Sequence, residues 1–127
     1  MSVLVRRALP ADGPAFLALV RALAAFESLP PPDDDAAARL VADAFADPPR
    51  YELWVAEVDG AVAAYAATFM TYSTFRARPT LFLEDLFVHP DARRRGAHHV
   101  LPKPLDSAQV ASLLRRMIVD ARPRTAA

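Results

Sequence analysis

Two adjacent carboxylates, Glu84 and Asp85, lie in the strand-like segment "TLFLEDLFV" and are the residues best suited to acid–base chemistry. Apolar residues flank the pair on both sides. Burial among such side chains disfavours the charged form of a carboxylate, which is how general bases are tuned. Successive side chains of a strand point to opposite faces, so the two carboxylates cannot share a proton unless a bulge intervenes. The alternative is that both are solvated at the end of a strand.

A basic turn, "RRRGAHH", follows this segment and has the composition of an anion site. A glycine such as Gly96 lets backbone N–H groups converge on a phosphate, and a helix that begins there adds its dipole. Two histidines and two prolines follow the glycine, where that helix is expected. The alternative is a basic surface loop.

The histidine and cysteine content argues against several other kinds of site. His98 and His99 are adjacent and diverge in any regular element, and His89 has no carboxylate at a suitable spacing, so we expect no metal site. The sequence has no cysteine, which excludes a disulfide framework, a thiolate metal site and a cysteine nucleophile. No Ser-His-Asp arrangement can be argued.

The composition is that of a single globular domain. The chain of 127 residues is 54% hydrophobic and 24% charged, with a formal net charge of +0, which disfavours disorder and a polyanionic partner. The arginines lack interleaved aromatic residues and any nucleic-acid motif, so we expect no nucleic-acid binding.

No segment predicts export or a membrane span. The amino terminus "MSVLVRRALPADG" has charges where a signal peptide needs an apolar core. The longest uncharged apolar stretch, near "AVAAYAATFM", is too short to cross a bilayer. We therefore expect a soluble, cytoplasmic protein with no membrane partner.

Two helices are predicted in the amino-terminal part of the chain, after the β-like run "VLVRRA". Asp12 can cap the first helix, Pro14 suits its first turn, and Pro30–Pro32 stop it. Its apolar residues recur at helical spacing: Phe16, Leu19, Val20, Leu23 and Phe26. The acidic run Asp33–Asp35 favours the start of a second helix, which ends near Pro48.

The hydrophobic period changes to that of strands from Tyr51 onward. Asp59-Gly60, between "YELWVAEV" and "AVAAYAATFMTY", predicts a hairpin of two antiparallel strands. Both faces of these strands are largely apolar, so helices are expected on both sides of the sheet. With "TLFLEDLFV" as the fourth strand, the predicted fold class is α/β (α+β), a mixed, mainly antiparallel sheet flanked by helices and truncated after that strand.

The tail carries one more amphipathic segment. "HVLP" has the character of a short strand, and Asp106 or Ser107 can cap a helix. One apolar stripe follows the cap: Val110, Leu113, Leu114, Met117 and Ile118.

The order of these elements and two tandem motifs resemble one known family. "YELWVAEVDGAVAAYAATFMTYSTF" running into "LFLEDLFVHPDARRRG" is similar to the GCN5-related N-acetyltransferase (GNAT) family, in particular its diamine (spermidine/spermine) acetyltransferase-like branch. That branch shows a tyrosine-rich third strand with a "TYSTF"-like end, then "L-[YF]-L-E-D-[LF]-[FY]-V" and a basic "R-x-x-G-x-G/A" turn. The resemblance covers about residues 3–96.

The resemblance implies a GNAT-like fold and acetyl-CoA as the co-substrate. The backbone of the fourth strand, splayed by a bulge, would pair with the pantetheine arm, and the amides of the basic turn would receive the pyrophosphate. The cofactor-binding residues implied in this way are Leu86, Phe87, Val88, Arg93, Arg94, Arg95, Gly96 and Ala97.

The resemblance also implies a small amine or a polyamine as the acceptor. Glu84 would be the catalytic residue, binding the ammonium or drawing off its proton through water. Phe26 and Glu27, in "AAFESLP", match positions at the end of the first helix that help to hold a polyamine. The reaction is direct attack of a neutral amine on the thioester, which needs a base, an oxyanion partner and a proton for the leaving thiolate.

Three departures from the family pattern predict weak or absent activity. His98 stands where the family has Gly or Ala and would crowd the approach of the backbone to phosphate. Pro102 and Pro104 interrupt the expected helix, at a cost of about 3 kcal/mol or more each. The tyrosine that such enzymes use as a general acid comes from a later segment, which this chain is expected to lack.

The tail has a resemblance of its own. "GAHHVLPKPLDSAQVASLLRRMI" resembles the end of a response-regulator receiver domain, in which Lys103 would contact an aspartyl phosphate. We therefore interpret residues 1–96 as the amino-terminal part of a GNAT domain and residues 97–127 as a receiver-like tail that is not an independent domain. The alternative is a divergent acetyltransferase with its own tail.

A rival to the enzymatic function is a non-catalytic remnant that acts as an interaction module. In that hypothesis the tail helix packs on the incomplete sheet or on a second copy. An unpaired apolar edge of the fourth strand also predicts a homodimer or aggregation, unless "HVLP" fills that edge.

Overall fold

The computed structural model describes residues 2–92 and 107–119. Its elements, in chain order, are β1 (Val3–Arg7), α1 (Gly13–Phe26), α2 (Asp34–Ala44), β2 (Glu52–Val58), β3 (Ala61–Ser73), β4 (Arg78–Val88) and α3 (Ser107–Val119). The four strands of the described residues form one antiparallel sheet in the order β1-β2-β3-β4. The predicted antiparallel hairpin and the mainly antiparallel sheet of four strands are therefore confirmed.

The turn between β2 and β3 is the two-residue loop that its sequence predicts. Asp59 and Gly60 both have positive φ, 51° and 86°, and Val58 pairs with Ala61 across the turn. Two positive φ values in succession match the twist of a hairpin, and Asp-Gly tolerates them. The turn sets the first two β2–β3 pairs, Val58–Ala61 and Glu57–Val62. The register then shifts by one residue, because Ala56 pairs with Ala64, and this irregularity sets the faces of the side chains that follow.

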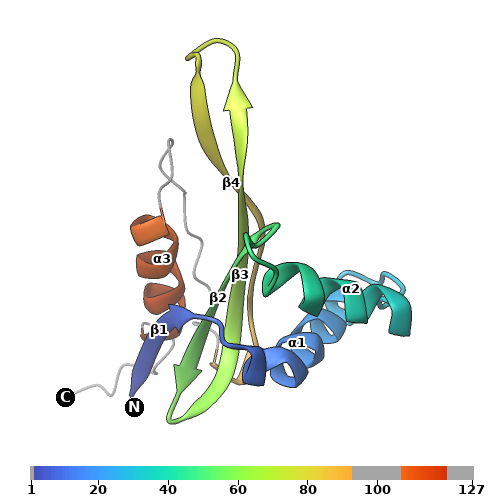
Figure 1. Ribbon diagram of the computed structural model, residues 1–127. Coiled ribbons are helices and arrows are strands. Elements are labelled where there is room, and N and C mark those ends of the chain that lie inside the picture. Colours follow the sequence, from blue (N-terminus) through green and yellow to red (C-terminus); the bar gives the residue numbers. More distant parts are fainter. Residues whose placement is uncertain (1, 93–106, 120–127) are drawn as a thin grey trace, which may run out of the picture.

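Helices cover both faces of the sheet, with α1 and α2 on one side and α3 on the other (Figure 1). We call these the α1 face and the α3 face. The core of the α1 face contains Phe16, Leu19, Ala44, Leu53, Val55, Tyr65, Ala67 and Phe87. The core of the α3 face contains Ala56, Ala64, Ala66, Val88, Val110, Leu114 and Ile118. The two-sided burial and the apolar stripe of the tail helix are as predicted.

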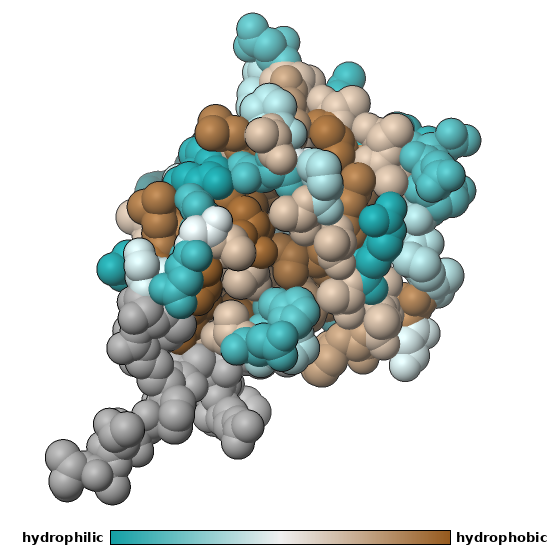
Figure 2. Space-filling view, turned by 90° about the horizontal axis from the view of Figure 1, so that it is seen from below, coloured by the Kyte–Doolittle hydropathy of each residue, from teal (hydrophilic) through white to brown (hydrophobic). Residues whose placement is uncertain are grey.

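Strands β3 and β4 continue beyond the helical layers as a long two-stranded arm (Figure 1). Large apolar side chains stay exposed along it: Met70, Tyr72, Phe75 and Phe82. At the opposite end of the molecule, apolar side chains gather in the centre and hydrophilic ones surround them (Figure 2). In the described part of the chain, no helix combines the length and the apolar character that a bilayer span requires.

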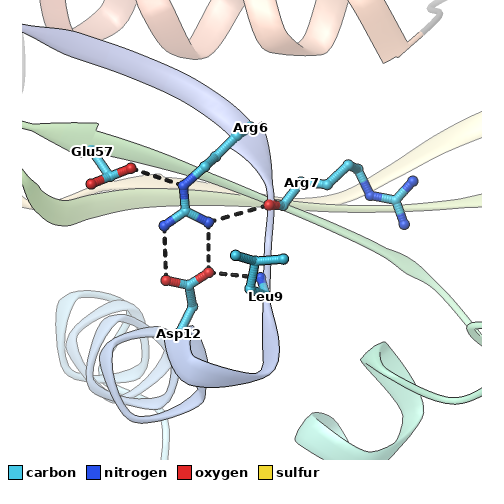
Figure 3. A network of polar contacts seen from close by, with 5 residues as sticks. All are labelled: Arg6, Arg7, Leu9, Asp12 and Glu57. Carbon is cyan, nitrogen blue, oxygen red and sulfur yellow. Dashed lines mark hydrogen bonds and ion pairs between the residues drawn. The ribbon is translucent and has the colours of Figure 1, made fainter.

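A polar network joins the first strand to the first helix and to β2 (Figure 3). The Arg6 guanidinium donates to both carboxylate oxygens of Asp12, at 2.7 and 3.0 Å, and its Nε donates to Glu57 at 2.8 Å. Asp12 also accepts from the backbone N–H of Leu9 at 2.7 Å, which closes the 3-10 turn Pro10–Asp12. Although Asp12 lies at the N-cap position of α1, its side chain makes no capping bond there. The predicted capping role was wrong, because Arg6 and Leu9 engage the carboxylate.

We expect this network to make the stability of the fold depend on pH. Hydrogen bonding to Arg6 lowers the pKa of Asp12, against the opposing effect of burial. A folded-state pKa below the unfolded value, which is near 3.9, gives stability that is present above that value and lost as the pH falls through the folded pKa. Asp12→Asn should lower the free energy of unfolding by about 2–3 kcal/mol at neutral pH.

Urea unfolding of both proteins at about pH 7 and about pH 3 measures this effect, and the difference between them should shrink at the lower pH. Asp47→Asn, at an exposed position in the loop that follows α2, is the matched control. An equal loss of stability at both pH values would contradict the assignment.

Candidate active site

A β-bulge in β4 places the two adjacent carboxylates. Ala67 of β3 pairs with Asp85, while the next residue, Thr68, pairs with Leu83. Glu84 is therefore the extra residue, with no partner of its own in the β3–β4 register. In a regular strand the two adjacent side chains would point to opposite faces of the sheet. With the bulge, both carboxylates line one cavity.

This cavity has a volume of about 280 Å³ and lies between the α1 face of the sheet and the two amino-terminal helices. Its apolar lining consists of Phe16, Val20, Leu40, Ala67 and Phe69. Its polar lining consists of Tyr51, Tyr65, Glu84 and Asp85. Among these described lining residues there are two acids and no base, so the cavity favours a cation with an apolar portion.

The two carboxylates differ in exposure and in partners. Glu84 is exposed, so it can exchange a proton with solvent water. Asp85 is half-buried, and its Oδ2 accepts a hydrogen bond from the Tyr65 hydroxyl at 3.3 Å. Glu84 is therefore open to solvent, whereas Asp85 is hydrogen-bonded to Tyr65 of the cavity wall.

Two tyrosines form the polar part of that wall. Tyr65 is fully buried and its ring meets the ring of Phe16 edge-on, with centroids 5.1 Å apart. Burial, and then the charge of Asp85 and its hydrogen bond, raise the pKa of Tyr65 well above its usual value. Burial, and then the charges of Asp43 and Asp85, raise the pKa of Tyr51 to about 12. Both phenols therefore stay protonated near neutral pH.

Tyr51 connects the cavity wall to a helix. Its hydroxyl donates to the backbone carbonyl of Leu40 at 2.7 Å, which links the residue before β2 to α2. Leu40 also lines the cavity. The hydrogen bond thereby holds one helical side of the cavity against the sheet.

The residues predicted to bind substrate are distributed differently. Glu84 lies at the cavity, whereas Phe26 and Glu27 are exposed at the carboxyl end of α1 and are not among its described lining residues. The charge of Glu27 nevertheless contributes to the raised pKa of Tyr65, so it acts on the cavity from outside.

The residues predicted to bind the coenzyme fall into two groups. Leu86, Phe87 and Val88 follow the bulge and pair with Ala66, Tyr65 and Ala64. Phe87 is buried in the core of the α1 face and Val88 in the core of the α3 face. The others, Arg93, Arg94, Arg95, Gly96 and Ala97, lie outside the described residues, as do His98, His99, Pro102, Lys103 and Pro104.

Sequence reasoning did not select Tyr51, Tyr65 or Phe69 for the site. A signal for Tyr65 was present, since it is the one large polar side chain in the small-residue run "AVAAYAAT" of β3. Its link to Asp85 joins residues 20 positions apart, so it depends on the β3–β4 register. That register depends on the bulge.

We expect the bulge residue to be removable without loss of the fold. Deleting Glu84 makes Leu83 and Asp85 consecutive opposite Thr68 and Ala67, which is a regular ladder with the same faces. The free energy of unfolding should change by about 1 kcal/mol or less. Deleting Leu83 is the control, because Glu84 then replaces a side chain of the α3 face. That variant should lose about 3 kcal/mol or more.

Urea unfolding of the two deletion variants and the parent chain provides the comparison. Greater damage from deleting Glu84 than from deleting Leu83 would show that the extra residue lies elsewhere in β4.

A family profile and a related protein both place this chain among acetyltransferases. The sequence profile of the Acetyltransferase (GNAT) family matches residues 18–102. Thialysine N-epsilon-acetyltransferase of Bos taurus is 32% identical over 135 residues, covering 96% of this chain and 78% of that protein.

Solved structures resemble the fold. A possible acetyltransferase from Clostridium difficile 630 superposes with a TM-score of 0.64 at 21% identity, covering 76% of this chain and 63% of that one. A Clostridium acetobutylicum protein described as a predicted acetyltransferase with acetyl-CoA gives 0.62 at 17% identity, covering 94% and 73%. The chain thus spans less than two-thirds of the Clostridium difficile protein. At these identities the likeness concerns the fold, and it confirms the predicted GNAT-like class.

Proposed function

We propose that this chain, which belongs to the acetyltransferase (GNAT) family, transfers an acetyl group from acetyl-CoA to the nitrogen of a small amine. Enzymes of this family take the acetyl group from acetyl-CoA, which supplies it as a thioester. The observation that carries the proposal is the bulge at Glu84, which delivers two carboxylates to one apolar cavity. The family resemblance implies that a bulge in this strand also splays the backbone that would pair with the pantetheine arm of the coenzyme.

The cavity suits a small alkylammonium as the acceptor. Its volume of about 280 Å³ is slightly below the roughly 300–1,000 Å³ of pockets that hold drug-sized ligands. Its apolar walls can cover an aliphatic chain while Glu84 and Asp85 face the charged nitrogen. The name of the bovine relative, an N-epsilon-acetyltransferase of thialysine, supports an amine nitrogen as the acceptor. A polyamine is a longer alkylammonium with further charged nitrogens. We propose that Glu27 lies near the second of these nitrogens when the first is in the cavity.

Glu84 is proposed as the base. An alkylamine with a pKa near that of lysine, about 10.4, is protonated at neutral pH and cannot attack a thioester. Glu84 can accept the ammonium proton, directly or through a water molecule, and its exposure lets that proton pass on to solvent. The freed nitrogen lone pair then attacks the thioester carbonyl and the C–S bond breaks. The nitrogen loses its second proton to solvent water, and the leaving thiolate takes up a proton from water, so the products are an amide and a free thiol.

Replacing this base should reduce turnover. Thiol release from acetyl-CoA in the presence of spermidine measures the reaction, and Glu84→Gln should lower kcat roughly a hundredfold or more. Glu52→Gln, on β2 and outside the described cavity lining, is the control and should retain the parent rate. Thiol release at background level by the parent chain would overturn the proposal and favour the non-catalytic interaction module.

Binding of the coenzyme is expected to be weak in this chain. Pro102 and Pro104 oppose a regular helix after Gly96, and a helix there would direct several amides at the pyrophosphate. Losing two charge-assisted hydrogen bonds weakens binding roughly a hundredfold or more. The remaining attraction, to arginines of the turn, is screened by salt.

Calorimetric titration with acetyl-CoA at low and high salt measures this binding, which should fade steeply as the salt rises. A chain with a "G-x-G-x-A-L-L"-like helix in place after Gly96 should recover affinity. Tight binding at both salt concentrations by the parent chain would show that the prolines are tolerated.

Other expectations from the sequence stay predictions. They are the division of the chain near Gly96, the cytoplasmic location and the homodimer. The exposed apolar side chains of the β3–β4 arm support self-association. The packing of α3 on the sheet supports a tail that shares the core of the amino-terminal part.

A further inference from the structure

Asp85 is the more deeply placed of the two cavity carboxylates. It is half-buried and faces Ala67 across the ladder, whereas Glu84 bulges out of the ladder and is exposed. Its Oδ2 accepts a bond from the Tyr65 hydroxyl at 3.3 Å. A carboxylate has two oxygens and about four acceptor sites, so this bond leaves acceptor capacity directed at the cavity.

Tyr65 is itself immobilised. Its side chain is fully buried, its ring is held edge-on against Phe16, and its backbone pairs with Val55 on one side and Phe87 on the other. The phenol remains a neutral donor, since burial and the neighbouring Asp85 charge oppose its ionisation. The hydroxyl therefore fixes the direction of the Asp85 carboxylate at little further entropic cost.

We propose that Asp85 is a second amine-binding carboxylate of this site and that Tyr65 is the residue that positions it. This inference rests on the proposed function, because it takes the acceptor to be an alkylammonium bound in the cavity. Asp85 anchors the ammonium by an ion pair, and Glu84 receives the proton that the nitrogen loses. The division follows from exposure, since the anchor Asp85 is half-buried and the base Glu84 is exposed to water.

Anchoring and proton transfer affect different kinetic constants. An interaction made equally in the bound and transition states appears in KM and leaves kcat unchanged, whereas loss of the base lowers kcat. Asp85→Asn should therefore raise KM for spermidine roughly ten- to a hundredfold, the equivalent of one charge-assisted hydrogen bond. Its kcat should stay within about threefold of the parent value.

Tyr65→Phe tests positioning, because it removes the hydroxyl and keeps the ring that packs on Phe16. It should raise KM for spermidine roughly three- to tenfold in the parent chain. In the Asp85→Asn background it should have no further effect, since a positioning residue acts only through its partner. Tyr72→Phe, on the exposed arm, is the matched control for the ring substitution. Asp35→Asn is the control for the acid-to-amide change.

Calorimetry with spermidine alone gives a second readout that needs neither acetyl-CoA nor turnover. The Kd should rise in Asp85→Asn and in Tyr65→Phe, and it should match the parent value in both controls. Thermal unfolding of each variant checks that the chain is folded. If the Tyr65→Phe variant is not folded, the spermidine Kd and KM of the Asp85→Asn variant still test the anchoring role.

The outcomes separate this inference from the proposed function. Unchanged spermidine Kd and KM in Asp85→Asn would overturn the anchoring role, with the acetyltransferase function intact. Additive effects of the two substitutions would overturn the positioning role of Tyr65. Spermidine binding without thiol release by the parent chain would overturn the proposed function and leave the ammonium site standing. No spermidine binding by the parent chain would overturn the anchoring role.

Discussion

One additional residue in β4 is the constraint on which the site depends. Side chains of a strand alternate between faces with a period of two, so an inserted residue moves all that follow to the other face. At Glu84 this change keeps Asp85 beside Ala67 on the α1 face and leaves Glu84 at the same cavity. A regular strand would have directed one of the two carboxylates into the apolar layer under α3. The bulge converts an adjacent acidic pair into a site with two carboxylates.

The same arrangement bears on the cation binding that we propose. Two like charges at one cavity repel each other, and the loss of hydration concerns Asp85, which is half-buried, rather than the exposed Glu84. The Tyr65 hydroxyl offsets part of that cost at Asp85. In the complex that we propose, an ammonium between the two acids would offset more. The repulsion in the free protein would then be a source of affinity for a cation.

Local patterns in the sequence predicted most of the fold, and interactions between distant residues account for what they missed. Asp59-Gly60 specified its hairpin because the turn depends on those two residues alone. Asp12 was predicted to cap a helix, but its carboxylate pairs with Arg6, which arrives from β1 only in the folded chain. Residue types selected Glu84 and Asp85 as an acidic pair, but the catalytic role of Glu84 came from a family resemblance, since "FLEDLF" fits a regular strand as well as a bulged one. The hydrogen bond from the Tyr65 hydroxyl to Asp85 forms only when β3 and β4 are paired in their final register.

The tail helix bears on the site although it lies on the other side of the sheet. Three residues after Glu84, Phe87 packs in the core of the α1 face, and the next residue, Val88, packs in the core that α3 completes. Two consecutive side chains of β4 are therefore buried on opposite faces of the sheet. A shift of the β4 register by one residue would move each of them to the opposite face. The small side chains of Ala56, Ala64 and Ala66 make the α3 face shallow, so a helix can approach the strands closely. By burying Val88, α3 holds the register that keeps Asp85 opposite Ala67, whatever the origin of the tail.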